Sequence, residues 1–167
     1  PLIGSEEFKI ASTTVVASFI ASFGISKAFT NLLSGELAVR WGRKKTLVLG
    51  WLIALPVPFL LIGAPNWNWV LFANLLLGVS QGLTWSMCVI MKVDLVGPKS
   101  RGLAVGLNEF SGYFMVGLTA FATGWIASEY GALRPEPFYL GIGYAFLGLF
   151  LCAFFVRDTK NHVQLEA

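Results

Sequence analysis

Two charged side chains lie deep inside otherwise apolar stretches of the sequence. Lys27 precedes the basic run that begins at Arg40 by thirteen residues, which places it about 20 Å from that end of a helix. Glu109 follows Arg101 by eight residues, or about 12 Å. Ionisable groups inside apolar helices are costly and usually face a bundle interior or a wet cavity. Three alternatives are open for Lys27. It binds an anionic ligand or coupling ion, it forms an ion pair with Glu109, or its side chain extends to a polar surface.

Polar side chains near these two charges recur at helical spacing. Asn31 follows Lys27 by one turn, and Asn108 adjoins Glu109. A stripe with the spacing i, i+4, i+7 and i+11 is formed by Asn74, Gly78, Gln81 and Trp85. An unsatisfied amide in lipid costs several kcal/mol, so these faces must meet other helices or water. Interhelical hydrogen bonding or core packing explains each residue singly. Together they favour one shared hydrophilic path, whose candidate ligand-binding residues are Lys27, Asn31, Gln81, Trp85, Asn108 and Glu109.

The elements that must position these residues are apolar and long. Of the 167 residues, 56% are hydrophobic and only 13% are charged, whereas soluble domains carry about 25% charged residues. A helix needs about 20 apolar residues to cross a bilayer, and five stretches qualify, at about 13–38, 47–64, 68–93, 101–127 and 138–156. We therefore expect an all-α integral membrane protein whose residues 1–167 form a single transmembrane helical domain, with a kink at Pro56 and Pro58.

Basic residues are concentrated in alternate connectors. One side collects nine of them, namely Arg40, Arg43, Lys44, Lys45, Lys92, Lys99, Arg101, Arg157 and Lys160. The other side has only Lys9 and Arg134, together with four glutamates. Because short cytoplasmic loops are enriched in Lys and Arg, we expect the carboxy-terminal tail to lie in the cytoplasm, in a cell (inner) membrane. We also expect the first helix of a six-helix unit to precede this chain.

One connector carries a specific motif. Residues 35–45 include Gly35, Leu37, Ala38, Arg40, Gly42, Arg43 and Lys44 at the spacing Gly-x-Leu-Ala-x-Arg-x-Gly-Arg-Lys. This segment resembles the loop between helices two and three of the major facilitator superfamily. The resemblance extends over the whole chain and implies helices two to six of an amino-terminal half-bundle. It also implies a gating loop formed by Gly35, Glu36, Arg40, Gly42, Arg43 and Lys44.

Three positions depart from the family pattern. Val39 stands where the motif has an Asp that helps to hold the cytoplasmic side closed, and Glu36 lies on roughly the same helical face and is a possible substitute. Asn74 stands where the family has an Arg often linked to proton coupling. The Gly-Pro motif of drug/proton antiporters is absent around Gly112 and Gly117. These departures weaken proton-driven drug export as a function.

The sequence therefore favours secondary transport of a small organic solute by alternating access. The segment Gly24-Ile25-Ser26-Lys27 resembles helix two of organophosphate/phosphate antiporters, in which the Lys helps to bind an anion, and this favours an anionic or sugar-like solute. Two alternatives are open. The protein exports a drug or metabolite in a proton-coupled reaction, or it is a transporter-derived membrane sensor that no longer transports.

No catalytic chemistry is expected. The single His162 lies in the tail, and the sequence contains no cysteine–histidine cluster, nucleophile elbow or phosphate-binding glycine loop. We expect no cofactor, no metal and no nucleic acid. The expected partners are the solute, protons or a counter-ion, the lipid bilayer, and the first helix and carboxy-terminal half of the same transporter.

Overall fold

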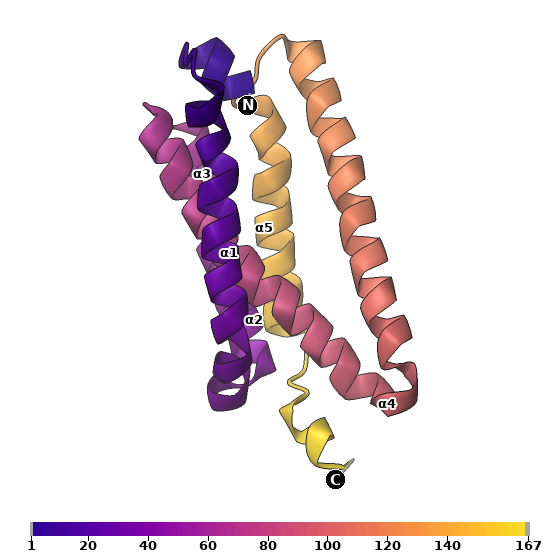
Figure 1. Ribbon diagram of the computed structural model, residues 1–167. Coiled ribbons are helices and arrows are strands. Elements are labelled where there is room, and N and C mark those ends of the chain that lie inside the picture. The colour runs from indigo at the N-terminus through magenta and orange to yellow at the C-terminus, as the bar shows by residue number, and fades with distance from the viewer. Residues whose placement is uncertain (1, 166–167) are drawn as a thin grey trace.

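The computed structural model describes residues 2–165, and its regular elements are all helical. They are η1 (Ile3–Glu7), α1 (Thr13–Trp41), α2 (Arg43–Ala54), α3 (Pro56–Ile62), α4 (Trp67–Tyr130), α5 (Glu136–Phe154) and η2 (Lys160–Leu165). Figure 1 shows α1, α5 and the second half of α4 running roughly lengthwise, while the first half of α4 runs obliquely to them. The connectors at 41–43 and 97–101 and the carboxy-terminal tail lie at one end, which we call the basic end.

The helix α4 consists of two long arms joined by a sharp reversal. Its 64 residues would extend about 96 Å if straight, against a hydrocarbon core of about 30 Å. The backbone breaks at Gly97, with φ 68° and ψ 174°, and Pro98 follows. Figure 1 shows the two arms forming a V at this point. We call residues 67–96 the first arm and residues 98–130 the second arm.

Local sequence signals explain where the helices begin and end. Ser12 and Asn66 accept hydrogen bonds from the backbone N–H groups of the first turns of α1 and α4, respectively, as N-cap residues do. Gly131 adopts a left-handed conformation and ends α4. Pro56 lacks a backbone N–H, so the expected single crossing at 47–64 is divided into α2 and α3, and the proline kink is confirmed.

Apolar side chains on the outer surface match a lipid environment. Leu32 and Phe121 are each 78% exposed, and many other large apolar residues are open. Within the described residues, four helical spans are long and apolar enough to cross a membrane, with α2 and α3 counted as one span and the two arms of α4 as another. The expected all-α membrane fold is therefore confirmed. The expected crossing at 101–127 is three residues longer at its carboxy-terminal end in the structure, where α4 ends at Tyr130.

Close packing of α1 on the first arm positions Lys27. A side chain at Gly78 would overlap Ser26 and the carbonyl of Phe23, and one at Gly82 would overlap Thr30. Only glycine allows the two backbones to come this close, as in small-x3-small helix pairs. Lys27, one residue after Ser26, is thereby held against the first arm.

One arginine joins three segments at the end of the bundle opposite the basic end. Arg134, between α4 and α5, donates from Nε to Glu7 Oε2 at 2.6 Å. Its Nη1 donates to the carbonyl oxygens of Leu61 and Ala64, at 2.9 and 3.0 Å. These carbonyls lie at the end of α3, where helical acceptors are otherwise unsatisfied. The contacts fix the ends of the helices whose central parts carry the polar residues.

Candidate functional site

Trp85, on the first arm, is the centre of a polar network within the bundle. The Lys27 Nζ of α1 lies 5.1 Å from the centroid of the Trp85 ring and 5.5 Å from that of Phe23. The same Nζ donates a hydrogen bond to Gln81 Oε1 at 3.2 Å. The Lys27 ammonium is thus held by a neutral amide and two aromatic faces, which stabilise a cation without neutralising it.

A carboxylate from the second arm binds the edge of the same indole. Trp85 Nε1 donates to Glu109 Oε1 at 2.9 Å, and Asn108 Nδ2 donates to the same oxygen at 3.2 Å. Asn108 is 5% exposed, and its Oδ1 accepts a 2.6 Å hydrogen bond from Lys92 Nζ. Five of the six residues expected at the cavity therefore belong to one connected network.

A glycine on the second arm makes room for the indole. A methyl group at Gly112 would overlap three ring atoms of Trp85. The Tyr113 ring packs edge-on against Trp85, with centroids 5.7 Å apart. The ring orientation is thus set by packing as well as by the hydrogen bond to Glu109.

The remaining expected residue lies beside this network. Asn31 is exposed, and its Oδ1 accepts a hydrogen bond from Ser86 Oγ at 3.2 Å. Lys27 Nζ donates to Gln81, while Glu109 accepts from Trp85 and Asn108. Trp85 thus contacts both the Lys27 ammonium and the Glu109 carboxylate.

Lys92 is a site residue that the sequence pattern placed only in the basic connectors. It lies seven residues after Trp85 and so continues the stripe of Gln81 and Trp85 on the same helical face. Periodicity was the signal that could have identified it. With Lys92 included, the network holds two ammonium groups and one carboxylate.

A cavity of about 690 Å³ adjoins the network, between α2, α3, both arms of α4 and α5. Its volume is in the range of small-molecule sites. Gln81, Trp85, Lys92 and Asn108 line one wall, and apolar residues including Val57, Leu61 and Phe138 line another. Lys27, Asn31 and Glu109 are not among the lining residues. Lys27 and Glu109 contact the polar wall from α1 and from the second arm.

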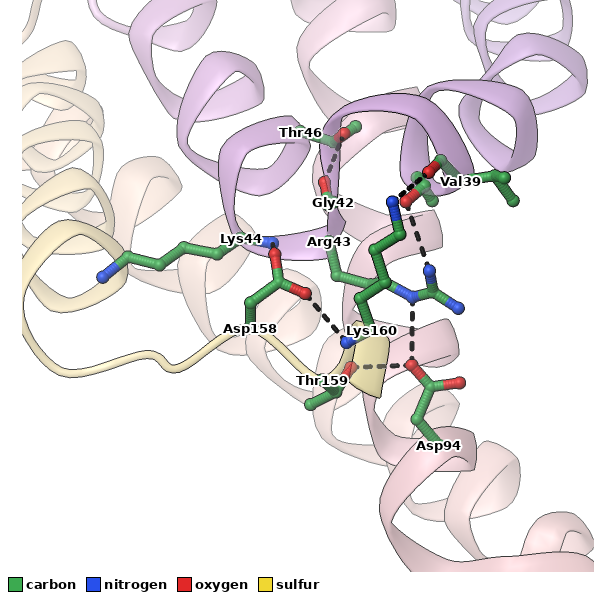
Figure 2. Close-up of polar contacts among 10 residues, drawn as sticks. Val39, Gly42, Arg43, Lys44, Thr46, Asp94, Asp158, Thr159 and Lys160 are labelled. Atoms are coloured by element: carbon green, nitrogen blue, oxygen red, sulfur yellow. Dashed lines mark hydrogen bonds and ion pairs between the residues drawn. The ribbon is translucent and has the colours of Figure 1, made fainter. Parts of the chain in front are cut away.

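The motif residues form a second cluster at the basic end (Figure 2). Arg43 Nε and Asp94 Oδ2 lie 3.1 Å apart, and their side chains are only 11% and 8% exposed. Thr159 Oγ1 donates to the same Asp94 oxygen at 2.6 Å, and Arg43 Nη1 donates to the Ala38 carbonyl at 3.2 Å. The cluster ties α1, α2, the first arm and the tail together.

Asp158, from the tail, serves as the N-terminal cap of α2. Its Oδ2 accepts from the Lys44 backbone N–H at 3.0 Å and its Oδ1 from that of Lys160 at 2.8 Å. Burial alone would raise the pKa of Asp158, but the backbone N–H groups of Lys160, Lys44 and Arg43 outweigh it and hold that pKa below its ordinary value. Gly42 occupies the N-cap position of α2 with a φ of 93°. A Cβ added to Gly42 would lie 2.5 Å from Asp158 Oδ2.

Glu36, the candidate substitute for the motif acid, lies near the carboxy-terminal end of α1. It forms an exposed ion pair with Arg40, one turn along α1, at 2.5 Å. The Val39 side chain is 60% exposed, and its carbonyl accepts a 2.6 Å hydrogen bond from Lys160 Nζ. Gly35 has open space around it. The motif is largely helical, since α1 continues to Trp41.

Comparison with known proteins identifies the family. The whole chain, residues 1–167, matches the Major Facilitator Superfamily. Solute carrier family 2, facilitated glucose transporter member 10, of Xenopus tropicalis is 27% identical over 79 residues, which cover 47% of this chain and 14% of that protein. The proton-coupled antiporter flippase LtaA of Staphylococcus saprophyticus is 36% identical over 108 residues, which cover 61% of this chain and 26% of the flippase. No solved structure matches the chain.

These matches agree with the helical bundle and with the motif at its basic end. The chain spans about a quarter or less of the length of either relative. The resemblance inferred from residues 35–45 is confirmed by the match over the full chain. The chain belongs to the Major Facilitator Superfamily, and its apolar helices are those of an integral membrane protein.

Proposed function

We propose that the complete protein moves a small anionic organic solute across the membrane by alternating access, with Lys27 at the solute site. The observation that carries this proposal is the set of partners of Lys27, a neutral amide and two aromatic rings. Because none of these three neutralises the ammonium, an anion has an electrostatic reason to bind there. With Lys92 and Glu109, the formal charge of the network is +2 − 1 = +1.

Gln81, Trp85 and Asn108 supply the remaining solute contacts in this proposal. Amide groups give hydrogen bonds of either polarity, and an indole ring presents a flat apolar surface. Asn31 extends the polar surface by one turn towards the basic end. A sugar-like neutral solute is the second candidate, since an aromatic ring with amides suits a polyol and one relative is a facilitated glucose transporter.

We assign the basic end to the cytoplasmic side of a cell membrane, as the positive-inside rule favours. In this orientation the Arg43–Asp94 pair and the Asp158 cap lie at the cytoplasmic mouth. The gating segment in this proposal consists of Gly35, Glu36, Arg40, Gly42, Arg43 and Lys44. The tail residues Asp158 and Lys160 stabilise the junction in this segment that contains Val39. Further segments of the transporter complete the cavity.

Ligand-dependent stability of the complete purified transporter tests the proposal. A solute that binds the folded state raises the apparent melting temperature by mass action. We expect stabilisation by organic anions such as glycerol 3-phosphate, and loss of that stabilisation in Lys27→Met. Stabilisation by glucose that survives in Lys27→Met would instead favour the sugar-like candidate and make Lys27 a structural residue.

A further inference from the structure

The cavity beside the network changes from polar to apolar along its length. On the first arm its lining runs from Lys92, near the basic end, to Leu77, fifteen residues earlier, which is about 22 Å along a helix. At the opposite end of the bundle, Leu61 of α3 and Phe138 of α5 line it with apolar side chains. A ligand that fills the whole cavity therefore needs one polar end and one apolar end.

The polar end of the cavity carries a positive charge. Lys92 Nζ donates a 2.6 Å hydrogen bond to Asn108 Oδ1, and this neutral amide leaves the charge of the ammonium in place. Gln81, which accepts from Lys27 Nζ at 3.2 Å, and Ser111 also line this part of the cavity. Ammonium groups form short, strong hydrogen bonds with the ionised oxygens of phosphates and carboxylates. An anionic head group therefore fits the polar end.

The apolar end lies between α3 and α5 and has space beside a glycine. Val57 and Leu61 line it from α3. A Cβ added to Gly141 of α5 would lie 3.5 Å from Pro58 Cβ, an ordinary van der Waals distance. Hydrocarbon placed against such a wall binds about fourfold more tightly for each buried CH₂ group. A compact anion such as glycerol 3-phosphate has no group that uses this end of the cavity, whereas an alkyl chain does.

We propose that the transported solute is an anionic amphiphile, with its head group at Lys92 and an alkyl chain that lies along the cavity between α3 and α5. This inference rests on the proposed function and names the substrate class of the same site. Lys27 attracts the head group from behind Gln81, across the polar wall. The apolar wall selects the chain, so the affinity depends on the length of the chain as well as on the charge of the head group.

Binding of alkyl phosphates to the complete transporter in lipid nanodiscs tests the proposal, with empty nanodiscs as the correction for partition into the bilayer. We expect the Kd to fall at least about twofold for each CH₂ group added between butyl and octyl phosphate, because the chain is partly buried. Octyl glucoside, which has a neutral head group, should bind at least about tenfold more weakly than octyl phosphate. Equal Kd values along the alkyl series would overturn the proposal.

The same measurements separate this inference from the proposed function. Glycerol 3-phosphate that binds while the alkyl series shows equal Kd values would refute the amphiphile and keep the anion site. Octyl glucoside that binds as tightly as octyl phosphate would refute the anionic head group and, with it, the proposed function. Within the proposal, tighter binding of 1-octylglycerol 3-phosphate than of octyl phosphate indicates a glycerolipid as the source of the amphiphile, and weaker binding indicates a free alkyl anion.

A pair of glycine variants on α5 locates the chain. Gly141→Leu places a side chain in the apolar end, so the Kd of octyl phosphate should rise to that of butyl phosphate, which itself should not change. Gly143→Leu is the matched control, since a Cβ there has nothing within 4 Å and lies about 160° around the helix. This control should bind both phosphates as the wild type does. An unchanged Kd of octyl phosphate in Gly141→Leu, or an equal loss of affinity in both variants, would overturn the assigned position of the chain.

Discussion

Replacement of Gly112 by alanine should disturb the network through packing alone. The added methyl group would overlap the Trp85 ring, which Tyr113 and the hydrogen bond to Glu109 hold in place. Gly143→Ala is a matched control. Gly143 has nothing within 4 Å, and it lies about 160° around α5 from Gly141, which faces the bundle.

The difference between the two variants isolates the packing cost. Both variants gain the same helix propensity, up to about 1 kcal/mol, so this contribution cancels. What remains is the overpacking at Trp85, typically about 1–3 kcal/mol. We therefore expect the free energy of unfolding of Gly112→Ala to be about 1–3 kcal/mol below that of Gly143→Ala.

Reversible denaturation of the complete transporter in mixed micelles measures this difference. Tryptophan fluorescence of the folded state provides a second readout, since only Gly112→Ala should alter the surroundings of Trp85. Equal unfolding free energies and unchanged fluorescence in the two variants would refute the assigned contact between the second arm and the indole.

Three further predictions concern the cluster at the basic end. Asp94→Asn or Arg43→Met alone should lower the unfolding free energy by about 3–5 kcal/mol, since each leaves a buried charge unpaired; the double variant should lose less than the sum, and strict additivity in a double-mutant cycle would argue against the pair. The lowered pKa of Asp158 means that its contribution to stability is present above its unfolded pKa and is lost as the pH falls below about 4 through the folded value. Asp158→Asn should flatten stability in that window, and an unchanged acid profile would contradict the cap. Gly42→Ala should destabilise by about 1–3 kcal/mol, because φ is 93° and Asp158 lies in the way; thermal melts at neutral pH check this, and a wild-type melting temperature would contradict it.

Periodicity and hydropathy were sufficient to predict the helices and the faces that carry the polar residues. The stripe of Gln81 and Trp85 lies against Lys27 as expected, because a helical repeat determines which side chains share a face. The apolar content of the long stretches and the concentration of basic residues in the connectors can be read directly from the sequence. They therefore appear in the sequence without knowledge of the tertiary contacts.

The choice of partners could not be predicted in the same way. Lys27 contacts Gln81 and Trp85 because the relative rotation and depth of α1 and the first arm decide which atoms meet. Asp158 caps a helix that begins more than one hundred residues earlier, and no local pattern relates the two. Where Val39 interrupts the motif, Lys160 from the tail binds its carbonyl.

Solute exchange in proteoliposomes that contain the complete transporter tests the central claim most directly. Vesicles preloaded with unlabelled glycerol 3-phosphate are supplied with the radiolabelled compound, and the rate of uptake is measured for the wild type, Lys27→Met and Gly143→Ala. We predict saturable uptake by the wild type and by Gly143→Ala, and at least a tenfold lower rate in Lys27→Met, about 1.4 kcal/mol or more. Uptake by Lys27→Met at the rate of the wild type, or uptake of glucose but not of the anion by the wild type, would contradict the assignment of Lys27 to an anion site.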